Sequence, residues 1–333
     1  MSLMQDTGEQ RRDPSEDAVR RASAAFRELL STGWSLPLPG SGATSERWRA
    51  LTTLGERDLP LARLAEGHAD AVAVLAEVGG PGVPTGARLG VWAAEPPDGP
   101  VTATRTAAGW RLSGRKRWCS GAGVLTAALV TAAADDGRRL FLVHLDHPGV
   151  RVDGSAWVTA GMAGSDTADV HLADVPADPV GPPRAYLDRP GFWHGGLGVA
   201  AVWAGGARGV AATLLRTAVE RGPDPLRDAA LGAVDVRLTA LDAALAVAAA
   251  EVDADPRDTT GTAQLRAQRV RALAARTGDE VLDVVGRTLG AGPLAHDPAH
   301  AARVADLTVY LRQHHGERDL AALGALVRGR AAR

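Results

Sequence analysis

Several common residue types are scarce or missing in this sequence of 333 residues. It contains no isoleucine and no asparagine, and only one of its 37 basic residues, Lys116, is a lysine. These three residue types have AT-rich codons, so a GC-rich genome explains the three shortages together. The large excess of arginine is therefore no evidence for phosphate recognition.

The chain also has little cysteine and no long apolar segment. Its single cysteine, Cys119, excludes an intramolecular disulfide framework and any multi-cysteine zinc or iron–sulfur site. No uninterrupted apolar run reaches the roughly 18 residues that a membrane span needs. The segment from Met1 to Glu16 is polar and carries charges of both signs, which is unlike a secretory signal. We therefore expect a cytoplasmic protein with no membrane partner.

Charge of neither sign dominates. The 37 basic and 39 acidic residues give a formal net charge of −2 at pH 7. Aromatic residues make up only 4% of the chain and are not interleaved with a basic stripe, so we expect no nucleic-acid partner. Hydrophobic residues at 45% and charged residues at 23% are typical of a globular protein, which excludes a disordered or collagen-like chain.

The spacing of apolar residues predicts a small helical domain in the N-terminal part of the chain. Residues 1–17 are predicted to be a disordered tail. Apolar residues then recur at helical spacing in Ala18–Leu30, Ser45–Thr53 and Leu59–Val78. The glycines and proline at 79–82 end the last helix, so the first domain is predicted to cover residues 18–88.

The pattern changes at Leu89 to short β-prone runs separated by turn dipeptides. The runs are Gly90–Ala93, Val101–Thr104, Trp110–Leu112, Ala127–Ala132, Leu140–Leu145, Val150–Val152 and Asp169–Leu172. Short strands at this spacing predict an antiparallel barrel or sandwich, here a middle domain over residues 89–182.

Four long Ala/Leu-rich stretches follow, and they predict an antiparallel four-helix bundle over residues 183–333. These stretches are Leu197–Glu220, Pro225–Val252, Thr262–Leu289 and Ala299–Val327. The predicted fold class is therefore α+β, with a β domain between two helical domains.

Several local motifs fit this unusual domain order. They are the GWRLSGRKRWCS segment Gly109–Ser120, the Glu95-Pro96 pair before it, the segments Gly161–Thr167 and Ala204–Gly209, the glycine turn Gly286–Gly292, and the R-x-x-D-x-x-x-Y stretch Arg303–Tyr310. In this order, over roughly residues 45 to 325, they resemble the acyl-CoA dehydrogenase superfamily. The resemblance implies that the middle domain is an antiparallel β-barrel.

The resemblance also implies a cofactor site for FAD. Trp118 would pack against the isoalloxazine, the Ser120 hydroxyl would hydrogen-bond near N5, and Cys119 lies between them. The backbone from Val91 through Ala94 to Glu95 would meet the pyrimidine edge of the ring. The adenine end would reach a neighbouring subunit at a turn that includes Asp283, Gly286 and Arg287. The implied substrate is an acyl thioester of CoA or a carrier protein, and the implied assembly is a homodimer or homotetramer.

One departure from the family concerns the base that removes the substrate proton. The alignment on Arg303–Tyr310 puts His314 where the family has its catalytic glutamate, and the alternative carboxylate position falls near Val199. A histidine can act as a general base at neutral pH, so His314 is the candidate catalytic residue. The competing interpretation is that His314 is an ordinary polar residue on the last helix.

Other departures concern the cofactor and leave three functions open. The family's Arg-x-Thr-Phe-Gly segment has no counterpart at Glu220–Pro225, and its Gly-Ser-Asp loop is replaced by Pro97-Asp98-Gly99. The chain is expected to be an FAD-dependent dehydrogenase, with a flavin monooxygenase or a non-catalytic relative with weakened flavin binding as alternatives. His296 and His300 lack a metalloprotease pattern, so no metal site is expected.

Overall fold

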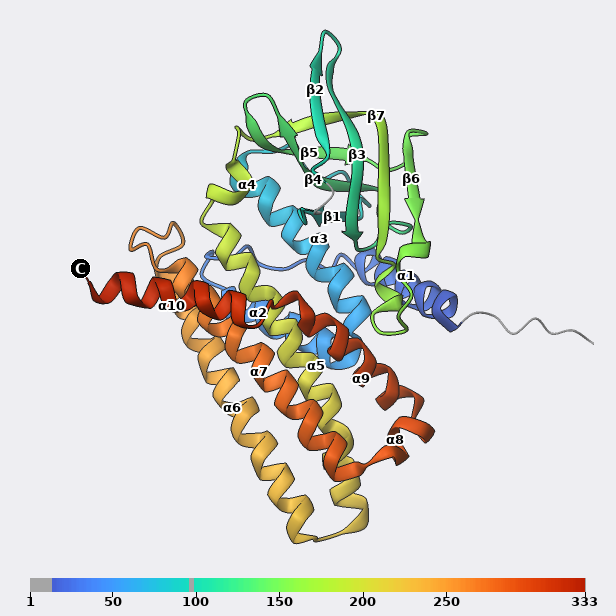
Figure 1. Ribbon diagram of the computed structural model, residues 1–333, viewed down its shortest axis with the longest axis vertical. Helices are drawn as coiled ribbons and strands as arrows, with labels where there is room; N and C mark the ends of the chain where they lie inside the picture. The colour runs from blue at the N-terminus through green and yellow to red at the C-terminus, as the bar shows by residue number, and fades with distance from the viewer. Residues whose placement is uncertain (1–13, 96–98, 333) are drawn as a thin grey trace, which may run out of the picture.

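The computed structural model describes residues 14–95 and 99–332 of the chain (Figure 1). Its first part consists of the helices α1 (Pro14–Ser31), α2 (Thr44–Arg57) and α3 (Leu59–Val78). Helix α1 begins at Pro14, so the predicted tail is wrong for residues 14–17, and the remainder of it lies outside the described residues. Helix α3 begins where the Asp58 side chain accepts a hydrogen bond from the Leu61 N–H, and it ends at Gly79 in the left-handed conformation.

The middle of the chain forms a closed β-barrel, as predicted. Its strands are β1 (Leu89–Trp92), β2 (Thr102–Thr106), β3 (Gly109–Cys119), β4 (Ala127–Ala134), β5 (Gly137–His144), β6 (Val150–Asp153) and β7 (Ala168–Val180). Strand β5 pairs with both β7 and β4, which closes the ring β4–β2–β3–β7–β5. Most pairings are antiparallel, but β4 runs parallel to β1 and β2. The alternation of side chains between core and surface gives no information on strand direction.

The C-terminal part is helical, and its long helices lie side by side below the barrel (Figure 1). They are α4 (Ala185–Asp188), α5 (Gly191–Arg221), α6 (Pro225–Ala254), α7 (Ala263–Leu289), α8 (Ala291–His296), α9 (Pro298–Tyr310) and α10 (Glu317–Ala331). Three 3-10 turns, Gly154–Ala156, Ala163–Ser165 and Leu311–Gln313, complete the described elements.

The predicted fourth long helix, Ala299–Val327, is broken in the structure. Helix α9 ends at Tyr310, a 3-10 turn follows, and His314 is extended. Gly316 then has a φ of +55°, a conformation that other residues rarely adopt and that cannot continue a right-handed helix. Helix α10 crosses the upper end of the bundle in Figure 1, where it contacts α7, and it contains no buried residue. Three long helices and α9 therefore form the bundle.

Helix α5 is the core of the molecule. By length and composition it is the one described helix that could cross a membrane, but 78% of its most apolar window is buried inside the protein. A Cβ atom on Gly205 would lie 2.1 Å from the Thr52 carbonyl oxygen of α2. The glycines of α5 thus permit close contact between helices.

A direct hydrogen bond links the barrel to the bundle. The N–H of Met162, in the loop before β7, donates to Asp306 Oδ1 at 2.5 Å. Burial raises the pKa of Asp306 to about 6, although this bond opposes the shift. Asp306 belongs to the R-x-x-D-x-x-x-Y stretch, so this motif positions the barrel loop on α9.

Candidate functional site

Trp118 lies at an irregularity near the end of β3. Between Lys116 and Cys119 this strand has one residue more than its partner β7, so the ladder contains a β-bulge. Trp118 has a φ of +56°, and its side chain is 53% exposed. A large aromatic residue held outward by an unfavourable backbone conformation is typical of a ligand site. The Cys119 side chain points the other way and is fully buried, so only the backbone of Cys119 is available to a cofactor.

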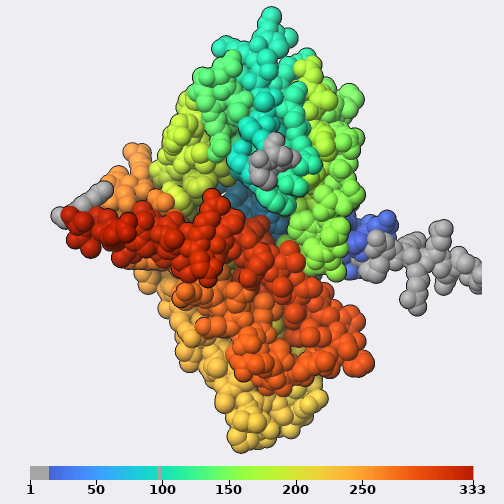
Figure 2. Space-filling view, in the orientation of Figure 1, coloured from blue at the N-terminus to red at the C-terminus, as the bar shows by residue number. Residues whose placement is uncertain are grey.

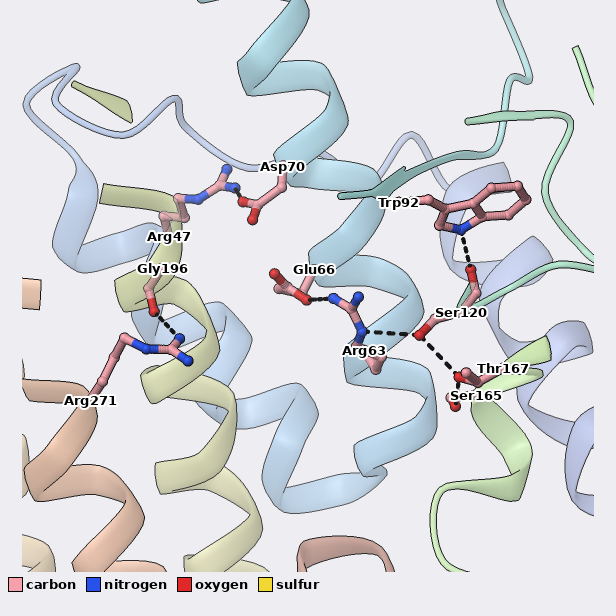
Figure 3. Close-up of polar contacts among 10 residues, drawn as sticks. All are labelled: Arg47, Arg63, Glu66, Asp70, Trp92, Ser120, Ser165, Thr167, Gly196 and Arg271. Atoms are coloured by element: carbon pink, nitrogen blue, oxygen red, sulfur yellow. Dashed lines mark hydrogen bonds and ion pairs between the residues drawn. The ribbon is translucent and has the colours of Figure 1, made fainter. Parts of the chain in front are cut away.

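The Ser120 hydroxyl has partners from two elements (Figure 3). Its oxygen accepts hydrogen bonds from Arg63 Nε of α3 at 3.3 Å and from the Thr167 hydroxyl at 3.0 Å. The backbone is fixed as well, because the Trp92 indole N–H donates to the Ser120 carbonyl oxygen at 3.0 Å. The hydrogen of the Ser120 hydroxyl has no acceptor among the described residues. It is therefore available to an acceptor atom of a ligand.

Charged side chains cover one face of α3 beside Ser120. Arg63 pairs with Glu66 on the next turn, and Asp70 pairs with Arg47 of α2 at 2.7 Å (Figure 3). Glu66 is only 2% exposed. Burial raises the pKa of Glu66 to about 7, Arg63 opposes this shift, and the nearby Asp70 adds to it. Glu66 is thus a carboxyl group that gains or loses a proton near neutral pH.

Two residues of the bundle face the same cluster. Arg271 of α7 donates from Nη1 to the Gly196 carbonyl oxygen at 2.9 Å and lies over the Trp203 ring. Burial lowers the pKa of Arg271. Tyr310 of α9 is buried, and its hydroxyl donates no hydrogen bond among the described residues. Burial raises the pKa of Tyr310, the charge of Glu66 adds to the shift, and the nearby Arg63 guanidinium opposes it.

Figure 2 shows a hollow between the barrel and the segment α9–α10, with the blue N-terminal helices as its floor. The cluster comes from the elements around this hollow. We use the name interdomain cleft for the cluster of Ser120, Arg63, Glu66, Tyr310 and Arg271, in which Glu66 and Tyr310 are each only 2% exposed. A small void of about 10 Å³ marks its narrow end, where Ser120 meets α3 and β1. The volume suffices for one water molecule.

Of the predicted residues in and after β1, only Val91 lies at this narrow end. Val91 lines the small void and is half-buried, and Ala94 follows the end of the strand. The Glu95 carboxylate accepts a hydrogen bond from the Thr131 hydroxyl at 2.9 Å and lies 3.5 Å from the buried Lys116 ammonium. Glu95 therefore anchors the chain after β1. Residues 96–98 lie outside the described residues.

His314 lies between the 3-10 turn and α10. Its Nδ1 accepts from the Gly316 N–H at 3.2 Å, and its Nε2 is 3.9 Å from Asp319. Burial lowers the pKa of His314 while Asp319 opposes the shift, so the ring is neutral at pH 7. With Nδ1 occupied as an acceptor, the proton belongs on Nε2. His314 thus has no free lone pair for a proton in this arrangement.

The predicted adenine-end residues lie in another part of the protein. Asp283, Gly286 and Arg287 belong to the last turns of α7 and not to a turn, and Arg287 pairs with Asp283 at 2.7 Å. Arg287 also lines an open cavity of about 890 Å³ at the far end of the bundle. Three further arginines line this cavity: Arg216, Arg221 and Arg227. Within one chain, the structure does not bring these residues to Ser120.

Sequence reasoning missed most of the cleft. Arg63, Glu66 and Asp70 share one face of the predicted helix Leu59–Val78 at spacings of three and four residues. This row of charged residues on an otherwise apolar helix could have indicated a functional site. Arg271 and Tyr310 had no such signal, since only tertiary packing brings α7 and α9 close to α3.

Comparisons with known proteins agree with this description. Residues 95–175 match the family "Acyl-CoA dehydrogenase, middle domain". No curated protein sequence matches the chain.

Several solved structures share the fold over nearly the whole length. KijD3, in complex with FMN and a dTDP-linked sugar, is 20% identical with a TM-score of 0.73, and the match covers 95% of this chain and 94% of that one. Glutaryl-CoA dehydrogenase from Mycobacterium smegmatis, in complex with FADH2, is 18% identical with a TM-score of 0.72, covering 94% and 95%. TdsC from Paenibacillus sp. A11-2, with FMN and indole, is 18% identical with a TM-score of 0.71, covering 93% and 96%.

The sequence-based recognition is therefore confirmed. Residues 95–175 match the middle domain of acyl-CoA dehydrogenases, and the chain as a whole shares the fold of these solved structures. Identities near 20% show the fold and leave the reaction open.

Proposed function

We propose that the protein is an FAD-dependent oxidoreductase that oxidises an acyl thioester of CoA or a carrier protein at its α and β carbons. The observation that supports it best is the pair Trp118 and Ser120. An exposed aromatic ring and a hydroxyl with an unused proton suit a flat heteroaromatic ligand that carries a hydrogen-bond acceptor. These residues fit the isoalloxazine ring, whose N5 atom is such an acceptor.

The chain's own residues would orient the ring and manage the substrate proton. When bound, a flavin supplies hydride acceptance, which no side chain can provide. Trp118 would hold the ring by stacking, while Arg63 and Thr167 direct the Ser120 proton away from the barrel and toward the ring. Because the ring nitrogens of His314 are engaged, we assign the proton-accepting role to Glu66, the carboxyl group of the cleft. A pKa of about 7 suits a general base at neutral pH.

The far cavity supports FAD over a smaller flavin. Its volume of about 890 Å³ and its arginines suit a pyrophosphate and adenosine. Arg221 is exposed and has no ion-pair partner among the described residues, so it remains available to a phosphate. Since this cavity is remote from Ser120 within one chain, a complete site would need a second copy. We therefore expect a homodimer or homotetramer, which sedimentation at micromolar concentration tests.

A flavin monooxygenase is the second candidate. The family's two carboxylate positions are occupied by His314 and Val199, and Val199 is buried in the core of the bundle. An enzyme whose reduced flavin reacts with oxygen does not require a carboxylate at either position. The neutral imidazole of His314 is compatible with this chemistry.

An FAD titration of the full-length protein, followed by fluorescence quenching, tests the proposal. We expect saturable binding that Trp118→Ala and Ser120→Ala both weaken, while Ser113→Ala, on an exposed part of the same strand, leaves it unchanged. Reduction of the bound flavin by an acyl-CoA without NAD(P)H supports the dehydrogenase, and Glu66→Gln should then abolish it while His314→Gln does not. Reduction only by NAD(P)H or a reductase supports the monooxygenase. Folded oligomeric protein that binds no flavin would point to a non-catalytic relative.

A further inference from the structure

Arg271 differs from the buried arginines of the described chain. Two arginines of that part of the chain, Arg47 and Arg266, are buried. Arg47 pairs with Asp70 at 2.7 Å, and Arg266 pairs with Glu251 at 2.7 Å. Arg271 is half-buried, burial lowers its pKa, and it forms no ion pair within 4 Å among the described residues, although Asp319 and Glu66 are near enough to oppose the shift. A partly desolvated guanidinium without a paired carboxylate keeps N–H groups that a ligand can bind.

The contacts of Arg271 leave one edge of its guanidinium available. Nη1 is used by the Gly196 carbonyl oxygen, and the plane of the group lies 4.8 Å from the Trp203 ring centroid. These two contacts fix the orientation of the side chain. The Nε–Nη2 edge has no partner among the described residues, and its two parallel N–H groups match the two oxygens of a carboxylate.

Tyr310 provides a second unused donor, and it contacts the same Trp203 ring as Arg271. Its ring packs edge-on against the same Trp203, with centroids 6.2 Å apart. Its side chain is only 2% exposed, and its hydroxyl donates no hydrogen bond among the described residues, although the Arg63 guanidinium, itself a donor, is close enough to lower its pKa. A buried hydroxyl without a hydrogen bond costs about 1–3 kcal/mol in proteins. The unused groups here are donors, so a ligand that offers acceptor oxygens would complete the site.

We propose that Arg271 and Tyr310 form a subsite for a carboxylate group of the substrate, on the bundle side of the interdomain cleft. The assignment to the substrate rests on the proposed function, whereas the subsite itself requires no flavin. The surrounding charges favour a carboxylate over a phosphate. Glu66 and Asp319 are both close enough to affect Arg271, and a dianion would be repelled by them more strongly than a monoanion.

Calorimetric titration of the flavin-free, full-length protein with butyrate tests the subsite. Butyramide has a similar shape without the charge and should not bind. We expect butyrate to bind at least tenfold more weakly to Arg271→Gln and several-fold more weakly to Tyr310→Phe. Arg276→Gln, which removes an exposed arginine of the same helix, should bind butyrate like the parent. Equal affinity for Arg271→Gln and the parent, or an equal loss in Arg276→Gln, would overturn the proposal.

A thermal unfolding series separates binding from a structural role. If Arg271 serves a ligand, Arg271→Met without butyrate should unfold at the temperature of the parent or above it, because an uncompensated charge is removed. Arg47→Met should unfold at a lower temperature, because the partly buried Asp70 loses its partner. An equally large decrease for Arg271→Met would show that Arg271 is structural and would refute the subsite. FAD titration of Arg271→Gln should match the parent, so absence of flavin binding in both would refute only the proposed function.

Discussion

Glu66→Gln isolates the electrostatic cost of the carboxyl group on the cleft floor. The pKa of Glu66 is about 7 in the folded protein against 4.5 for a free glutamate, because burial disfavours the carboxylate. The folded state therefore binds more protons than the unfolded state between these values, and stability falls as the pH rises through this window. At about 1.4 kcal/mol per pKa unit, Glu66 should cost the parent roughly 2–3 kcal/mol between pH 5 and pH 8.

Urea unfolding of the parent and Glu66→Gln at pH 5, 6, 7 and 8 measures this cost. Glutamine keeps an acceptor for Arg63 and does not ionise, so the parent should lose stability relative to the variant by about 2–3 kcal/mol over this range. The difference between the unfolding free energies of the two proteins does not contain the contribution of Asp306, because both proteins retain this residue. Glu220→Gln, on the surface, serves as the control and should show a constant difference. A constant difference for Glu66→Gln as well would refute the assigned pKa and its role as a proton acceptor.

Two further predictions follow from packing. Gly205→Ala should destabilise the protein by several kcal/mol, because its Cβ atom would collide with the Thr52 carbonyl oxygen and the backbone of α2. Gly286→Ala, whose Cβ atom would meet no atom within 4 Å, should be neutral or stabilise the protein by up to about 1 kcal/mol. Urea unfolding compares the two variants, and similar effects would contradict the close contact of α2 with α5. Cys119 should react with Ellman's reagent only after unfolding, because its thiol is fully buried and burial raises the pKa of the thiol. Fast labelling of the native protein would contradict the orientation assigned to β3.

Much of the architecture could be predicted because its signals are local. The apolar spacing of Leu59–Val78 and the glycines after it determine a helix and its end, and the continuous apolar run at 127–132 determines a strand that is buried along that run. The predicted helix Ala299–Val327 shows the limit of such signals. Its composition favours a helix throughout, but the 3-10 turn after Tyr310 and the positive φ of Gly316 divide it.

The sequence by itself therefore determined the order of helices and strands, the barrel motif around Trp118 and Ser120, and the resemblance of the middle domain to acyl-CoA dehydrogenases. Only the tertiary structure decided which side chains meet in the interdomain cleft. Arg63, Arg271 and Tyr310 belong to three helices that are distant along the chain, and their relative positions depend on how α3, α7 and α9 pack against α5 and the barrel. The same packing removes water from Glu66 and Arg271. Desolvation is a property of the assembled surroundings, so no local pattern of residues could reveal the shifted pKa values of these two groups.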